Sequence, residues 1–162
     1  MICRAYLDIE TTGLSRYYAD LTVVGVCLEY GRQCKIIQLV GERITAGRVI
    51  AAVKKAEILY TYNGARFDLP FIKTKLGIDL TEYITHKDLM YDCWRQNLYG
   101  GLKVVEEKLA IARKTQGIDG RMAVRLWYEY QYYGNNKALA LLLEYNREDV
   151  VNLTVLRRKL NG

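Results

Sequence analysis

Two acidic side chains near the N-terminus constrain the fold of this chain more than any other feature. They are Asp8 and Glu10, inside the strand-forming run of residues 5–14, AYLDIETTGL. Side chains two residues apart in a strand point to the same face, so the carboxylates stand side by side, and they repel each other unless a cation lies between them. The Thr-Thr-Gly that follows ends the strand, and ligands commonly bind at that end of strands with α/β connections. We interpret the pair as a metal site, although two solvated acids would be the simpler interpretation of this stretch in isolation.

Composition indicates one globular domain, residues 1–162, with 51% apolar and 26% charged residues. No apolar run approaches the ~20 residues that span a bilayer, and the first residues lack a signal-peptide pattern, so we expect a cytoplasmic protein without membrane contact. The four cysteines contain no CxxC pair, and we expect them to be buried free thiols rather than zinc ligands. The net charge of +6 suits a polyanionic partner such as nucleic acid.

Strand-like and helical patterns alternate in a way that predicts a mixed sheet. Further strands are expected over residues 21–30, 33–40, 57–62 and 83–91. The first three strands should form an antiparallel meander, and a helix over residues 46–56 should return the fourth strand parallel to the first. This order resembles a ribonuclease H-like α/β fold, with a mixed five-stranded sheet (three antiparallel strands plus two parallel) flanked by helices.

The remaining segments are predicted to be mainly helical. Helices are expected over residues 67–76, 100–111 and 118–130, and again from residue 136. Asp68 begins the first of these and could simply cap it. His86 and Asp88 share a face of the expected fifth strand, where a lone histidine is more often structural than a ligand.

Basic and aromatic residues alternate before the last helix. They are Arg113, Lys114, Arg121 and Arg125, with Tyr128, Tyr130, Tyr132 and Tyr133. Such side chains can hold a single nucleic-acid strand by ion pairing and base stacking, but most of these tyrosines could equally pack in the core.

Tyr145 and Asp149 lie four residues apart on the last helix, so they share one face. A surface hydrogen bond between them is the plain alternative. With Asp8-x-Glu10 and the segment from Asn63 to Phe67 and Asp68, however, they make a third acidic signal in one chain.

This set of motifs resembles the DEDD superfamily of 3′-to-5′ exonucleases, in the branch where a tyrosine precedes the last aspartate by four (DEDDy). The histidine branch would need His where Glu144 stands. TYNGARFDLPFI (residues 61–72) and YNREDVVNL (residues 145–153) look like motifs of family B DNA polymerase proofreading domains. HKDLM (residues 86–90) and GGLKVVEEKLAI (residues 100–111) look more like stand-alone YprB-like ribonuclease H-like domains.

The resemblance implies a two-metal site for Mg²⁺ or Mn²⁺, hard cations that prefer carboxylate ligands. Asp8 would bridge both ions, Glu10 and Asp149 would complete the site on the nucleophile side, and Asp68 would hold the second ion, partly through water. Tyr145 would orient the attacking water rather than abstract its proton, since a free phenol has a pKa of ~10.

Substrate contacts are also expected from the resemblance and from proximity to the motifs. The expected set is Thr11, Thr12, Leu14, Asn63, Arg66 and Phe67, with Lys103 and Arg147 as further phosphate contacts. Leu14 would pack against the terminal base, unless it belongs to the core. Asn63 would shape its loop or touch the substrate backbone.

We therefore expect a metal-dependent 3′-to-5′ exonuclease that acts on single-stranded DNA first and RNA second and releases nucleoside monophosphates. One alternative is a structure-specific endonuclease on the same fold. Another is a non-catalytic binding or interaction module of a replication or repair complex, and a replication or repair protein is a candidate partner in either case.

Overall fold

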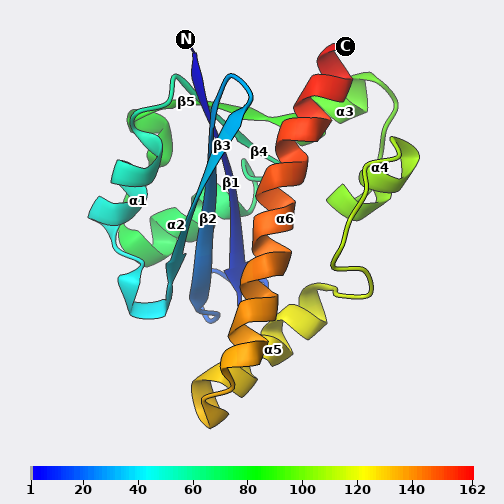
Figure 1. The fold of residues 1–162 in the computed structure, drawn as a ribbon. Coiled ribbons are helices and arrows are strands. Elements are labelled where there is room, and N and C mark those ends of the chain that lie inside the picture. Colours follow the sequence, from blue (N-terminus) through cyan, green and yellow to red (C-terminus); the bar gives the residue numbers. More distant parts are fainter. Residues whose placement is uncertain (1) are drawn as a thin grey trace.

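The computed structural model describes residues 2–162, so residue 1 of the expected domain lies outside the described residues (Figure 1). The strands are β1 (Cys3–Thr11), β2 (Leu21–Tyr30), β3 (Gln33–Val40), β4 (Ile58–Thr61) and β5 (Thr85–Asp88). The α-helices are α1 (Ala46–Val53), α2 (Asp68–Leu76), α3 (Leu89–Arg95), α4 (Leu102–Lys108), α5 (Gly120–Tyr133) and α6 (Asn136–Asn161). Short 3-10 helices occur at η1 (Gly41–Arg43) and η2 (Leu80–Glu82).

The strands form one five-stranded sheet in the order β3-β2-β1-β4-β5. β1 is antiparallel to β2 and β2 to β3, whereas β4 is parallel to β1 and β5 is parallel to β4. The mixed sheet and flanking helices confirm the predicted ribonuclease H-like fold. β1, which carries the first two carboxylates, lies at the centre of the sheet.

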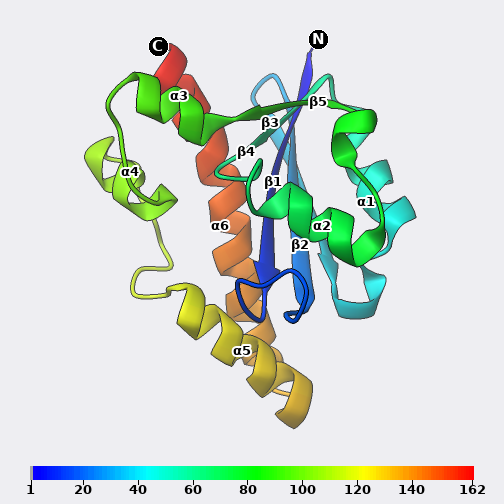
Figure 2. The same cartoon turned by 180° about the vertical axis from the view of Figure 1, so that it is seen from behind.

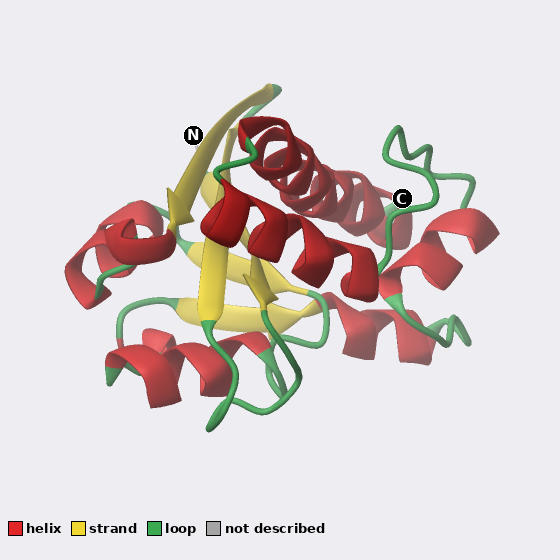
Figure 3. Ribbon diagram, turned by 90° about the horizontal axis from the view of Figure 1, so that it is seen from below, coloured by secondary structure: helices red, strands yellow, loops and turns green. Residues whose placement is uncertain are grey.

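Helices cover both faces of the sheet, as the views from behind and from below show (Figures 2 and 3). Because side chains alternate along a strand, Ala5, Leu7 and Ile9 face the core beneath α1 and α2. Tyr6, on the other face, joins the core formed with α3, α4 and α6. Asp8 and Glu10 are in phase with Tyr6 and therefore point to the α6 side. Among the described helices, none has both the length and the apolar character needed to cross a bilayer.

The region around β5 differs from the sequence prediction. The strand expected over residues 83–91 covers only Thr85–Asp88, and α3 follows at once. Asp88 explains this change, because its carboxylate accepts a hydrogen bond from the backbone N of Met90 (3.0 Å) and caps α3. The prediction missed α3 because the apolar residues of this short helix also fit the end of a strand.

Helix ends also differ from the predicted ones. The helix expected over 46–56 ends at Val53, and the one expected over 100–111 ends at Lys108, shortly before Ala110 adopts a φ of 56°. α5 continues to Tyr133, three residues beyond the predicted end, and stops at Gly134, whose φ of 64° suits glycine.

The four cysteines are not all free thiols. Cys27 on β2 and Cys34 on β3 form a disulfide, with Cα atoms 6.1 Å apart, so the expectation of a free thiol is wrong for this pair. The tight turn between the two strands brings these residues together although seven positions separate them. Cys3 and Cys93 are buried free thiols, as predicted.

Candidate active site

Asp8, Glu10 and Asp149 form the centre of the candidate site. Each offers a carboxylate oxygen, and these oxygens all lie within 4.8 Å of one another. β1 supplies the first two, and α6, which packs across the same face of the sheet, supplies the third. Packing of α6 against β1 thus brings side chains that are far apart in sequence into one cluster.

Asp68 lies beside this cluster, at the start of α2 just after β4. It is buried, and its Oδ2 accepts a hydrogen bond from the backbone N of Ile9 (3.1 Å), which lies between Asp8 and Glu10. Burial raises the pKa of Asp68 to about 7, and nearby carboxylates add to the shift, although the Ile9 bond opposes it. Its side chain therefore turns toward β1 instead of capping α2.

Burial disfavours the charged form of each carboxylate in the cluster. Removal from water is the largest cause that raises the pKa of Asp8 and Glu10 well above the usual values, and repulsion by Asp149 is the next. Burial also raises the pKa of Asp149, although Arg113 opposes that shift. Oxygen ligands that repel one another in a buried site are suited to a hard divalent cation.

Tyr145 lies one helical turn before Asp149 and is also buried. The Nζ of Lys103 donates a hydrogen bond to its hydroxyl oxygen (2.5 Å) and lies 4.5 Å from the ring centroid. Desolvation, followed by repulsion from Asp149 and Glu10, raises the pKa of Tyr145 above its ordinary value. The phenol is therefore protonated at neutral pH.

Asn146 is a site residue that the sequence analysis missed. Its Nδ2 donates to the backbone O (3.2 Å) and to Oδ2 (3.3 Å) of Asp8, and its Oδ1 accepts from Nε2 of Gln38 (3.0 Å). Gly25 pairs with Asp8 across the strands, and a Cβ at Gly25 would lie 2.1 Å from Oδ1 of Asn146. A glycine in the middle of an apolar strand was the available signal of this close approach.

Arg113 is a second residue whose position only the structure reveals. Its Nη2 donates to Oδ1 of Asp149 (2.6 Å) and to Oε1 of buried Glu106 (2.9 Å), and Asn152 also bonds Glu106. The carboxylate of Glu148 holds the same segment in place, because its two oxygens accept hydrogen bonds from the backbone N of Lys114 and Thr115, each at 2.6 Å. The connection between α4 and α5 is thus fastened to α6 beside the carboxylate cluster.

A pocket of about 770 Å³ opens next to Glu10. It contains four of the expected substrate contacts, which are Thr11, Thr12, Leu14 and Phe67. Leu14 is 88% exposed, which excludes the alternative that it belongs to the core. The other wall is the start of α5, through residues 119–121 and Val124.

Other expected contacts lie elsewhere. Arg66 lies over the rings of Tyr91 (5.9 Å) and Trp94 (5.3 Å) and is not part of the pocket lining. Asn63 adopts a φ of 61°, and its backbone N donates a hydrogen bond to Oδ1 of Asp88 (2.8 Å), so it shapes the loop after β4. Arg147 is exposed, and its Nη1 lies 3.8 Å from Oε1 of Glu144 in an ion pair.

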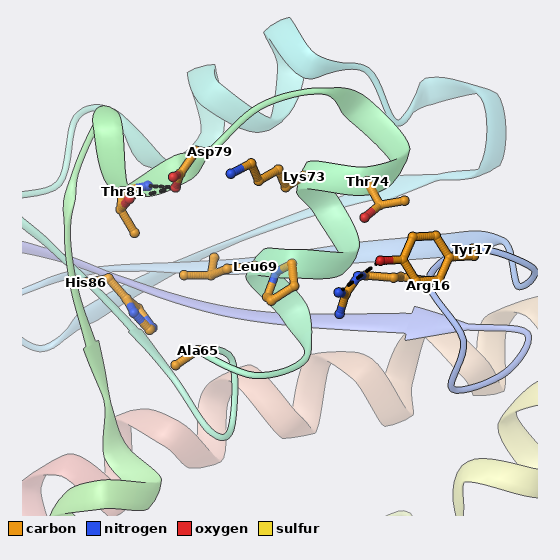
Figure 4. A pocket seen from close by; sticks show the side chains of 10 residues that line it. Arg16, Tyr17, Ala65, Leu69, Lys73, Thr74, Asp79, Thr81 and His86 are labelled. Carbon is orange, nitrogen blue, oxygen red and sulfur yellow. Dashed lines mark hydrogen bonds between the residues drawn. The ribbon is translucent and has the colours of Figure 1, made fainter.

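A second pocket, of about 570 Å³, lies beside α2 (Figure 4). Its lining includes Arg16, Lys73 and His86 and none of the four carboxylates. His86 Nε2 lies 2.8 Å from Oγ1 of Thr61, which agrees with the structural role expected for this histidine. We therefore assign the candidate site to the carboxylate cluster and to the first pocket, which Glu10 lines.

Solved structures with the same fold include a family B DNA polymerase, NrnC and exonuclease I. The family B DNA polymerase of Pyrobaculum calidifontis is 15% identical, with a TM-score of 0.73, over 99% of this chain and 24% of the polymerase. NrnC of Brucella melitensis is 19% identical, with a TM-score of 0.63, over 99% of this chain and 73% of NrnC, and it has also been solved with Mg²⁺ and with pGG.

A structure of exonuclease I is 13% identical, with a TM-score of 0.52, over 83% of this chain and 45% of that chain. No curated protein sequence is detectably similar to the chain. A family model described as the RNase_H superfamily matches residues 5–161. The chain therefore belongs to the RNase_H superfamily.

Proposed function

We propose that this protein is a metal-dependent 3′-to-5′ exonuclease of the DEDDy type, acting on single-stranded DNA first and RNA second. The observation that carries the proposal is the convergence of Asp8, Glu10 and Asp149, whose carboxylate oxygens lie within 4.8 Å of one another. Asp68 and Tyr145 adjoin them, so the five side chains expected from the motifs lie in one region of the molecule.

The carboxylate oxygens of the cluster are ligands that suit divalent metal ions. The four acids supply only oxygen ligands, and removal from water, the largest cause of their raised pKa values, leaves carboxylates that a bound cation would stabilise. Asp8, Glu10, Asp68 and Asp149 would hold the ions. Two Mg²⁺ or Mn²⁺ ions would supply Lewis-acid stabilisation of the phosphate charge and a more acidic attacking water.

Tyr145 would position the nucleophile. Because Lys103 donates to the phenol oxygen, the phenol proton remains free to be donated to the attacking water or to a phosphate oxygen. The raised pKa of Tyr145 argues against a role as general base, so we assign it orientation of the water. The ammonium of Lys103 would also lie close to the phosphate charge.

The pocket beside Glu10 suits the terminal nucleotide of a strand. Leu14 and Phe67 offer apolar surface for the base. Thr11 and Thr12 fix the loop, since Oγ1 of Thr11 donates to the backbone O of Gly13 (2.6 Å) and Oγ1 of Thr12 accepts from the backbone N of Asp20 (2.8 Å).

The proposal is tested with Asp149→Asn and a 3′-labelled single-stranded oligonucleotide. We expect a folded variant by circular dichroism that no longer releases mononucleotides with Mg²⁺ or Mn²⁺, and Asp20→Asn, an exposed acid, should behave as wild type. Full activity of Asp149→Asn would remove Asp149 from the mechanism. A circular single strand should resist the enzyme, and its cleavage would favour an endonuclease instead.

A further inference from the structure

The outward face of α5 carries two arginines and two tyrosines in one line. They are Arg121, Arg125, Tyr128 and Tyr132, at spacings of four, three and four residues, which place side chains on a single helix face. The buried residues of α5 are Ala123 and Trp127, on the side that packs against α6 and β2. We call the four outward residues the α5 stripe.

The two tyrosines of the stripe form a ready-made stacking surface. Their ring centroids are 5.6 Å apart and their planes differ by 13°, while Tyr128 is 38% and Tyr132 is 70% exposed. Tyr130, by contrast, packs on Trp127 with the core cluster of α5 and α6. The structure therefore separates stacking tyrosines from packing tyrosines, which the sequence pattern left open.

The stripe is continuous with the candidate active site. Arg121 and Val124 line the same pocket as Glu10 and Leu14. From there α5 runs beyond the C-terminal end of β1 and away from the sheet (Figure 2). From Arg121 to Tyr132 the stripe covers about 16 Å at roughly 1.5 Å per residue, which is long enough for several nucleotides.

The charges on this face also suit a polyanion. Arg121 and Arg125 are exposed, and the chain as a whole carries a net charge of +6. Two acids lie nearby, Asp119 as the N-cap of α5 and Glu129 on the helix. Each already accepts a hydrogen bond, Asp119 from the backbone N of Met122 (2.9 Å) and Glu129 from Nδ2 of Asn135 (3.2 Å).

We propose that the α5 stripe binds the single-stranded nucleic acid that leads away from the active site, with unpaired bases on Tyr128 and Tyr132 and phosphates at Arg121 and Arg125. The direction in which the strand leaves the active site rests on the proposed exonuclease function. The expected substrate is a strand several nucleotides long rather than a dinucleotide. Stacking on aromatic rings tolerates any base, so the site should be insensitive to sequence.

Binding is measured by fluorescence anisotropy of labelled dT12 and rU12 in EDTA, where no hydrolysis occurs. The Tyr128→Ala/Tyr132→Ala double variant should bind about ten-fold more weakly or worse, the loss expected when stacked bases lose their aromatic partners. The matched control is Tyr133→Ala, since Tyr133 is 85% exposed on the same helix but outside the stripe. Equal binding by wild type and the double variant would overturn the proposal.

The salt dependence of binding distinguishes the contribution of the arginines from that of the tyrosines. Arg121→Ala/Arg125→Ala should reduce the slope of log affinity against log salt by about 1.4, since each phosphate contact on a single strand contributes about 0.7. The tyrosine variant should keep the wild-type slope. An unchanged slope in the arginine variant would refute the phosphate contacts.

Hydrolysis of dT12 and of the dinucleotide pGG distinguishes this inference from the proposed function. The tyrosine variant should raise KM for dT12 about ten-fold and leave KM for pGG unchanged, because a dinucleotide in the active-site pocket does not extend to Tyr128 and Tyr132. An equal rise in KM for both substrates would refute binding of nucleic acid by the α5 stripe but would not contradict the proposed exonuclease function. Tyrosine-dependent binding of dT12 without any hydrolysis would support binding by the stripe and refute the exonuclease function.

Discussion

Replacement of Asp68 by Asn should stabilise the metal-free protein while it inactivates the enzyme. Burial raises the pKa of Asp68 from 3.8 to about 7, so above neutral pH the folded chain holds a carboxylate that would be more stable in the unfolded chain. An amide of the same shape removes that charge. It can also still accept the hydrogen bond from the backbone N of Ile9.

The pKa of Asp68 sets the size of the effect. A rise from 3.8 to about 7 corresponds to about 4 kcal/mol at about pH 8, with one pKa unit worth ~1.4 kcal/mol. Because neighbouring carboxylates share protons with Asp68, we expect about 2–4 kcal/mol. For a domain of this size that is a rise in Tm of roughly 5–15 °C.

The pH dependence has a defined sign. Between pH 3.8 and about 7 the folded state binds more protons at Asp68 than the unfolded state does, so the free energy of unfolding falls as pH rises through this window. The raised pKa values of Asp8, Glu10 and Asp149 act in the same direction. Wild type should therefore lose stability between about pH 5 and pH 8, and Asp68→Asn should lose less.

The free energy of unfolding is measured with urea in EDTA at about pH 5 and pH 8. Asp20→Asn is the control for loss of an exposed charge. Added Mn²⁺ should stabilise wild type at the higher pH more than it stabilises Asp68→Asn. The reasoning fails if the variant is no more stable than wild type at about pH 8, or if metal-free wild type gains stability as pH rises.

Two further variants test residues around the carboxylates. Tyr145→Phe should lower kcat by roughly 10- to 100-fold with little change in KM, because it removes the hydroxyl to which we assign orientation of the water, and a wild-type kcat would exclude that role. Arg113→Met leaves Glu106, which is 2% exposed, buried without its cation and should cost about 3–5 kcal/mol in urea unfolding. The double variant with Glu106→Gln should recover much of that loss, and no recovery would mean that Arg113 acts through other contacts.

The sequence predicted those parts of the fold where local periodicity and burial agree. β2 and β3 have the predicted ends, and the placement of Asp8 and Glu10 on one face of β1 follows from a period of two. The pairing of Tyr145 with Asp149 on α6 likewise follows from helical spacing. α3 escaped prediction because Asp88 caps it directly at the end of β5, where strand and helix patterns overlap.

The contacts of individual side chains with distant parts of the chain were decided only by the tertiary structure. Asp68 could have capped α2 and instead turns to Ile9, and Arg113 could have been one more surface cation and instead joins Asp149 to Glu106. Sequence determines which face of an element a residue occupies, since that depends on local backbone geometry. Which residue it contacts on another element depends on how the whole chain packs, and only the tertiary structure shows that.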